Sequence, residues 1–193
     1  MNLNPRPIYG NWRGGWTLDV HTVSSVKRAD GSFDTTRSEL GEMLYQLKYH
    51  HDRSQIAPIA ELTARFVKSR LVFPYLKAIV PIPPSDKNRP FQPVYEVASA
   101  VGKLVGLPVP LDYLLKVRDT VPVKNLEEEV RRREQLEGAL SVADDRFRGR
   151  YVLLFDDLYR SGETLSAAAT VLKDQGGVAR VYALALTRTR TKR

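Results

Sequence analysis

The sequence contains no cysteine in its 193 residues. Disulfide bonds and thiolate zinc sites are therefore excluded, and nothing in the composition points to an oxidising compartment. No apolar run is long enough to span a bilayer, and no basic start followed by an apolar segment marks a secretory signal. We therefore expect a cytoplasmic protein without a membrane partner, whose 42% hydrophobic residues form the core of a folded domain.

Acidic residues are the scarcer charged class. The 22 aspartates and glutamates face 30 lysines and arginines, which leaves a formal net charge of +8. Such an excess favours polyanionic partners. It does not choose between nucleotide phosphates, pyrophosphate and nucleic acid. The basic C-terminal residues are interpreted as a solvated end of the chain in preference to a DNA-binding arm.

The stretch Val152–Thr164 carries the most informative pattern in the sequence. The continuous apolar run Val152–Phe155 predicts a strand that is buried in a parallel sheet and stops abruptly at Asp156 and Asp157. A short polar turn follows, and helical spacing of apolar residues begins at Glu163. The two carboxylates should therefore lie at the carboxyl end of a strand, where open α/β sheets bind their ligands.

The chemistry of this stretch fits a phosphorylated sugar. A helix that begins after Ser161 and Gly162 presents free backbone N–H groups to a phosphate, and the Thr164 hydroxyl can add a donor. The adjacent carboxylates of Asp156 and Asp157 would repel that phosphate. They suit the vicinal hydroxyls of a ribose, or Mg²⁺ held through water. A ligand with a phosphate at one end and a diol at the other is a ribose 5-phosphate.

The pattern resembles the signature loop of the type I phosphoribosyltransferases, which bind phosphoribosyl pyrophosphate (PRPP). Their loop has an apolar strand, two acidic residues, a spacer, Ser/Thr-Gly and a further Ser/Thr. The resemblance implies that Asp156 and Asp157 are the catalytic residues and hold the ribose diol, directly or through Mg²⁺ and water. The residues that it implies for the 5-phosphate of PRPP are Arg160, Ser161, Gly162, Glu163 and Thr164. The alternative is a strand end with two solvated aspartates and an ordinary capped helix.

A second loop follows a predicted strand over Ala78–Ile82. Two cations in this loop could meet a pyrophosphate, although a proline-stiffened connection with solvated charges is the alternative. Phosphoribosyltransferases use a loop in this place for the pyrophosphate of PRPP. The residues that the resemblance implies for this role are Pro84, Ser85, Lys87 and Arg89.

The N-terminal part is the least familiar. Alternation over Trp16–Val20 predicts a half-buried strand, and Asp30-Gly31 predicts a hairpin turn before a return strand. Trp12 and Trp16 could stack a base, but they are interpreted first as cover for the core. His21 is interpreted as a structural histidine.

Three helices and a charged segment complete the pattern. Thr36 and Glu39 form a predicted capping box that opens the first helix, and helical spacing predicts two more over 54–68 and 94–104. The charged segment 118–140 fits a solvated surface helix. In phosphoribosyltransferases this place holds a mobile lid that excludes water from the reacting sugar.

The order of strands and helices predicts a doubly wound parallel sheet of the type I phosphoribosyltransferase kind. We expect an N-terminal hairpin and hood over residues 1–52, and a phosphoribosyltransferase-like α/β core with the lid over residues 53–193.

Three further stretches are similar to the ComF-like branch of the family, some of whose members serve in DNA uptake during competence. They are Leu47-Lys48-Tyr49, Val80–Pro83 and Arg118–Thr120. This branch commonly carries an N-terminal cysteine zinc module, which the chain lacks. The resemblance implies transfer of a phosphoribosyl group from PRPP-Mg to a nitrogenous acceptor, and a homodimer. The alternative is a non-catalytic PRPP or nucleotide sensor, or a protein that handles single-stranded DNA.

Overall fold

The computed structural model describes residues 3–85, 91–118 and 138–190. Its centre is a five-stranded sheet in the order β1-β2-β9-β8-β5. The last four strands run parallel to one another, and β1 is an antiparallel edge. The strands of this sheet are β1 (Arg6–Pro7), β2 (Gly14–Val20), β5 (Leu76–Pro81), β8 (Tyr151–Tyr159) and β9 (Arg180–Arg188).

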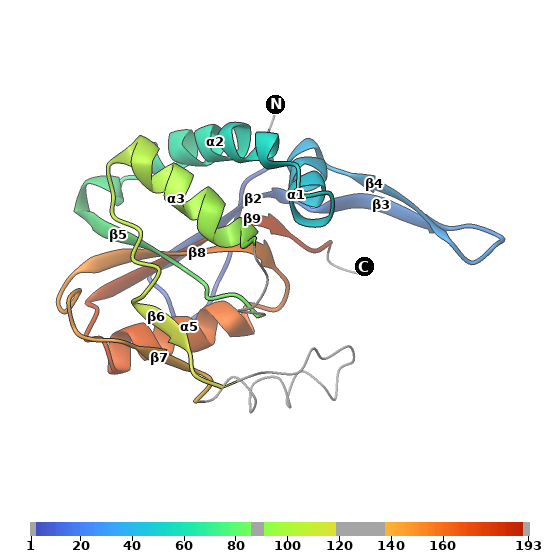
Figure 1. Cartoon of the computed structure of the whole chain (residues 1–193). Coiled ribbons are helices and arrows are strands. Elements are labelled where there is room, and N and C mark those ends of the chain that lie inside the picture. The colour runs from blue at the N-terminus through green and yellow to red at the C-terminus, as the bar shows by residue number, and fades with distance from the viewer. Residues whose placement is uncertain (1–2, 86–90, 119–137, 191–193) are drawn as a thin grey trace.

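Helices cover both faces of the sheet, which confirms the predicted doubly wound fold (Figure 1). On one face, α1, α2 and α3 share a core with β2, β8 and β9. On the other face α5 packs with a two-stranded ribbon of β6 and β7. The bounds are α1 (Glu39–Tyr49), α2 (Ile56–Lys68), α3 (Pro93–Val105), α5 (Glu163–Asp174), β6 (Leu114–Lys116), β7 (Leu140–Val142) and the 3-10 turns η1 (Arg53–Gln55) and η2 (Phe73–Tyr75).

The N-terminal strand has a different partner from the predicted one. β2 pairs in parallel with β9 inside the central sheet, and its Leu18 is fully buried. The hairpin around the predicted Asp30-Gly31 turn is formed instead by β3 (Thr22–Lys27) and β4 (Phe33–Arg37). This hairpin projects away from the sheet (Figure 1). The division at residue 52 stays a prediction.

The start of α1 also differs from the prediction. Thr36 lies in β4, so it cannot cap the helix, and the N-cap is Ser38. The Ser38 hydroxyl accepts a hydrogen bond from the Gly41 amide (3.0 Å) and donates one to the carbonyl of Val20 (2.5 Å). A Cβ at Gly41 would lie 2.1 Å from the carbonyl oxygen of His21. The glycine therefore lets α1 begin directly against the end of β2.

β8 does not stop before the aspartates, as the apolar run had predicted. The strand continues to Tyr159, because β9 is long enough to pair with it as far as Arg188. On its other side, pairing with β5 ends at Phe155. The segment that contains both aspartates therefore has one edge free of β5. The predicted lid lies mainly outside the described residues. Separately, no helix within the described ranges has the length and apolar character to cross a membrane.

Candidate active site at the carboxyl end of the sheet

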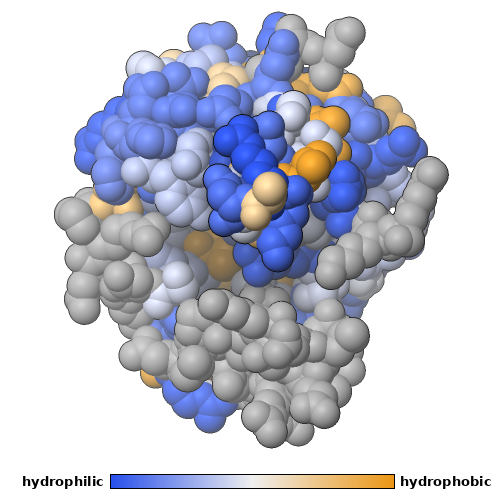
Figure 2. All heavy atoms as spheres, turned by 90° about the vertical axis from the view of Figure 1, so that its right-hand side faces the viewer, coloured by the Kyte–Doolittle hydropathy of each residue, from blue (hydrophilic) through white to orange (hydrophobic). Residues whose placement is uncertain are grey.

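A cavity of about 330 Å³ lies where β8 ends and α5 begins. Figure 2 shows the side of the molecule that contains this end of the sheet, with a hollow next to the projecting hairpin. The residues that line the cavity are Ser85, Asp156, Asp157, Leu158, Tyr159, Arg160, Ser161, Gly162, Glu163, Thr164 and Leu165. The structure thus brings the predicted acids, the predicted phosphate loop and Ser85 of the second loop to one place.

The two aspartates leave β8 in opposite directions. Leu153 and Phe155 pack in the core under α1–α3, whereas Leu154 packs in the core under α5. Because side chains alternate along a strand, Asp157 belongs to the α1 face and Asp156 to the α5 face. The carboxylates therefore meet different neighbours, although they are adjacent in the sequence.

Asp157 is held by a lysine from α1. Lys48 Nζ lies 2.6 Å from Asp157 Oδ2, and the side chains retain only 24% and 13% of their accessible surface. Burial alone would favour the neutral amine. The nearby Asp157 carboxylate outweighs burial and raises the pKa of Lys48 above its usual value. This ion pair fixes the position of the Asp157 carboxylate at the mouth of the sheet.

Asp156 has no ion-pair partner among the described residues. Its Oδ1 accepts a hydrogen bond from the Asp157 amide at 2.8 Å. Burial and the neighbouring Asp157 carboxylate raise the pKa of Asp156 to about 8. At neutral pH the carboxyl therefore holds a proton, which a cation bound nearby would displace.

The loop before α5 has an open set of backbone donors. Gly162 is the N-cap, with a left-handed φ of 86°, and its carbonyl accepts the first helical bond from Ser166 (2.8 Å). No side chain caps the helix, and from Ser161 to Thr164 the described residues supply no acceptor for a backbone N–H. A Cβ at position 162 would lie 2.9 Å from the Tyr159 ring. Free amides at a helix start form an anion site.

Glu163 was expected in the phosphate set because of its place in the loop. Its side chain does not suit that role, because its carboxylate would repel a phosphate. Its Oε2 is buried without a hydrogen-bond partner among the described residues. The backbone amide of Glu163 is the group that can face an anion.

Part of the predicted pyrophosphate loop is described. Ser85 lines the cavity and Pro84 precedes it half-buried, whereas Lys87 and Arg89 lie outside the described residues. Lys116 of β6 donates from Nζ to the carbonyl of Ser85 at 3.1 Å, and its side chain is buried. A cation from another element therefore lies beside this loop.

Solved structures provide the comparison. Adenine phosphoribosyl transferase from Trypanosoma brucei, in complex with AMP, pyrophosphate and ribose-5-phosphate, superposes with a TM-score of 0.50 at 14% identity over 86% of this chain and 74% of that chain. The chain has the fold of the type I phosphoribosyltransferases. UMP synthase from Leishmania donovani gives a TM-score of 0.44 at 15% identity, over 86% of this chain and 28% of that one. An allosteric regulatory enzyme of purine biosynthesis gives a TM-score of 0.48 at 16% identity, over 83% of this chain and 34% of that chain. No protein-family profile and no curated sequence matches the chain.

The fold brings two lysines to this region that the sequence pattern had not assigned to the site. Lys48 was noted only within the stretch Leu47-Lys48-Tyr49, without a place in the site, and Lys116 was not singled out. Both come from elements far from the loop in sequence, so only the assembled fold shows that Lys48 contacts Asp157 and Lys116 contacts Ser85.

His21 lies at the end of β2 with Nδ1 3.2 Å from the Thr22 hydroxyl. Burial, with Lys48 and Arg37, lowers the pKa of His21.

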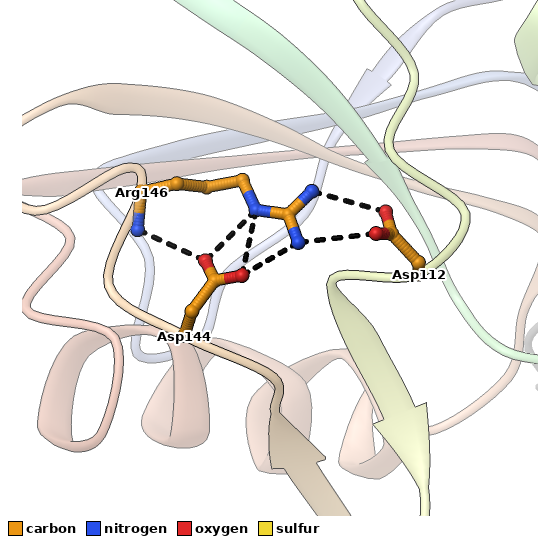
Figure 3. A network of polar contacts seen from close by, with 3 residues as sticks. All are labelled: Asp112, Asp144 and Arg146. Atoms are coloured by element: carbon orange, nitrogen blue, oxygen red, sulfur yellow. Dashed lines mark hydrogen bonds and ion pairs between the residues drawn. The ribbon is translucent and has the colours of Figure 1, made fainter.

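At one end of the β6–β7 ribbon, an arginine joins the segment before β6 to the segment after β7 (Figure 3). Arg146 makes two 3.1 Å hydrogen bonds to Asp112, before β6, and bonds of 2.6–2.9 Å to the Asp144 carboxylate, after β7. The ribbon connects on either side to the predicted lid at 118–140. The network therefore ties the chain together at the end of the ribbon where Leu114 pairs with Val142, whereas the predicted lid leaves from the other end, where Lys116 pairs with Leu140.

The described residues contain no group of three or more carboxylate and imidazole ligands that could hold a metal ion alone. A protein site of that kind is not required for Mg²⁺, which commonly takes one or two carboxylates and completes its shell with water and substrate phosphates. Of the two predicted ligands, Asp156 fits better, because Asp157 is already paired with Lys48.

Proposed function

We propose that the chain is a phosphoribosyltransferase that binds PRPP with Mg²⁺ and transfers the phosphoribosyl group to a nitrogenous acceptor with release of pyrophosphate. The observation that carries the proposal is the single cavity in which free amides of the 161–164 turn lie beside Asp156 and Asp157. A phosphate site next to carboxylates that accept hydroxyl donors is complementary to a ribose 5-phosphate. The Trypanosoma brucei enzyme of the same fold holds ligands of this class.

Each part of the cavity then has a role. The amides before α5 bind the 5-phosphate, with the exposed Arg160 guanidinium as an added charge. Asp157, fixed by Lys48, accepts hydrogen bonds from the ribose hydroxyls. Ser85 and Lys116 lie where the pyrophosphate leaves, and Lys116 adds a positive charge on that side.

Mg²⁺ supplies positive charge that neutralises the departing pyrophosphate. Asp156 is the group that would hold it, through water, because its carboxyl has no cationic partner among the described residues and carries a proton that a cation displaces. Departure of the leaving group from C1 puts positive charge on the ribose ring. Fixed carboxylates stabilise that charge, so no strong general base is needed and catalysis is mainly positioning and electrostatics.

Two glycines of similar conformation provide the test. Gly162 and Gly106 have left-handed φ values of 86° and 72°, so alanine strains the backbone at both, by about 1 kcal/mol. The two positions differ in the space around an added methyl group, because a Cβ at 162 would meet Tyr159 while a Cβ at 106 would meet nothing within 4 Å. We expect Gly162→Ala to weaken binding of PRPP-Mg in calorimetry by about a hundredfold or more, and Gly106→Ala to leave the affinity unchanged. Equal affinity in both variants would remove the phosphate site.

A non-catalytic PRPP or nucleotide sensor on the same fold is the second candidate. The observation in its favour is the Lys48–Asp157 pair, since the carboxylate expected to meet the ribose is already engaged. Release of pyrophosphate from PRPP, measured over a panel of nitrogenous bases, separates the two functions. Binding of PRPP without release of pyrophosphate in the presence of any base of the panel would favour the sensor. Single-stranded DNA and homodimer formation stay predictions of the sequence.

A further inference from the structure

A second, larger cavity lies at the opposite end of the sheet. Its volume is about 540 Å³, within the range of about 300–1,000 Å³ that small-molecule sites occupy. It is open to solvent and lined by residues near the starts of β2, β8 and β9 and by the chain that leaves α2. The residues on which the argument rests are Trp16, Arg70, Tyr75, Tyr151 and Tyr182.

The walls of this cavity are aromatic. The rings of Trp16 and Tyr182 are stacked nearly parallel, with an interplanar angle of 5° and ring centroids 6.3 Å apart. Tyr151 lies 6.3 Å from Tyr182, and Tyr75 lies 6.2 Å from Tyr151. The rings form a row across three neighbouring strands and η2. Tyr75 is 63% exposed, and the other three rings are half-buried. Such a row presents π surface to a planar ligand.

A cation stands at the same cavity. The Arg70 guanidinium lies 4.4 Å from the Phe66 ring centroid and 5.9 Å from that of Trp16. Its Nε and Nη2 donate to the Ser69 hydroxyl, at 3.3 and 2.9 Å. Within the described residues no carboxylate pairs with it, so Nη1 keeps its donors for a ligand. A guanidinium beside aromatic rings suits an anion that carries a flat ring.

The surroundings are positive as well. Exposed cations stand at the starts of the strands that form the cavity wall and of neighbouring β5, and none has an ion pair in the described part of the chain. They are Arg13, Lys77, Arg150 and Arg180. An uncompensated positive rim raises the local concentration of anions.

We propose that this cavity is a nucleoside monophosphate site, in which the base packs on Trp16 and Tyr182 and the phosphate meets Arg70. The site is separate from the cavity at the carboxyl end of the sheet, because it uses the opposite ends of the strands. It does not depend on the proposed transferase activity. A free mononucleotide is the occupant, because the one guanidinium among the lining residues, beside one row of rings, matches one phosphate and one base.

The two tryptophans of the chain allow a direct assay. Trp12 is buried in the other core, so Trp12→Phe leaves Trp16 as the sole reporter inside the cavity. In that background we expect AMP to quench the fluorescence saturably, adenosine to bind about tenfold more weakly, and inorganic phosphate not to quench. AMP and adenosine share a chromophore, so their optical effects cancel in the comparison.

Variants locate the signal. Arg70→Gln should weaken AMP about tenfold without changing adenosine, and Tyr75→Leu should weaken both. Lys103→Gln, at an exposed position on α3, is the matched charge control and should change neither. Gly162→Ala should leave the quenching intact, which separates this site from the candidate active site.

Four results would overturn the proposal. They are no saturable quenching by AMP, equal AMP affinity in Arg70→Gln and Lys103→Gln, loss of quenching in Gly162→Ala, and quenching by single-stranded oligonucleotides but not by AMP. The last result would assign the cavity to a polymer and not to a mononucleotide. Circular dichroism that matches the parent establishes that a weakened variant is folded.

Discussion

Replacing Asp156 by asparagine should change how the stability of the chain depends on pH. Burial and Asp157 raise the pKa of Asp156 from its ordinary value of 3.8 to about 8. Between these values the folded chain holds a proton that the unfolded chain has lost, so the contribution of this carboxyl to stability is greatest below about pH 4 and falls as the pH rises towards 8. At about 1.36 kcal/mol per pH unit, the full rise in the pKa of Asp156 corresponds to about 6 kcal/mol of stability. Partial contact of the carboxyl with water reduces this to about 2–4 kcal/mol.

The assay is urea unfolding at several pH values between 4 and 9. We expect the parent chain to lose about 2–4 kcal/mol more than Asp156→Asn across this interval, with the two curves meeting at the acid end. Above pH 8 the variant should be the more stable protein. Asp174→Asn, at an exposed position near the end of α5, removes the same charge and should follow the parent. Parallel curves for the parent and Asp156→Asn would show that the carboxyl is not protonated in the folded state.

Three further changes test contacts that hold the fold together in and around the site. Lys48→Met leaves the Asp157 carboxylate mostly buried and unpaired, so unfolding in urea should show a loss of about 1–3 kcal/mol. Adding Asp157→Asn to the Lys48→Met variant should restore part of the lost stability. Gly41→Ala places a Cβ 2.1 Å from the carbonyl of His21 and should lower the melting temperature, with about 1–3 kcal/mol of stability lost. Arg146→Gln should lower the melting temperature at low salt, and a difference that persists at 1 M salt would contradict the ionic role of this arginine.

Much of the fold follows from local patterns in the sequence. The buried run before Asp156, the helix after Gly162 and the parallel sheet are all confirmed. The end of the strand was predicted too early, because an apolar run reports burial whereas a strand lasts as long as its neighbour offers hydrogen bonds. β9 offers them as far as Arg188, and this information lies in another part of the chain.

The same limit explains the N-terminal strand. The alternation over Trp16–Val20 identifies a strand, but it does not identify the partner, and a nearby turn at Asp30 favoured a local hairpin. The parallel partner β9 lies at the other end of the chain. Lys48 was hidden for a related reason, since nothing around it in the sequence indicates that α1 places its side chain on Asp157.

The extension of β8 changes what two adjacent aspartates can do. If the strand had ended before them, both carboxyls would share one loop and compete for the same ligand atoms. On a continuing strand they point to opposite faces, so one is fixed by Lys48 and the other retains a proton. Under the proposed function this divides the work: Asp157 is a preformed acceptor for sugar hydroxyls, and Asp156 becomes an anion only when a cation arrives with the substrate. Mg²⁺ with pyrophosphate should therefore lessen the alkaline loss of stability in the parent chain and leave Asp156→Asn unaffected, which unfolding in the presence and absence of both would measure.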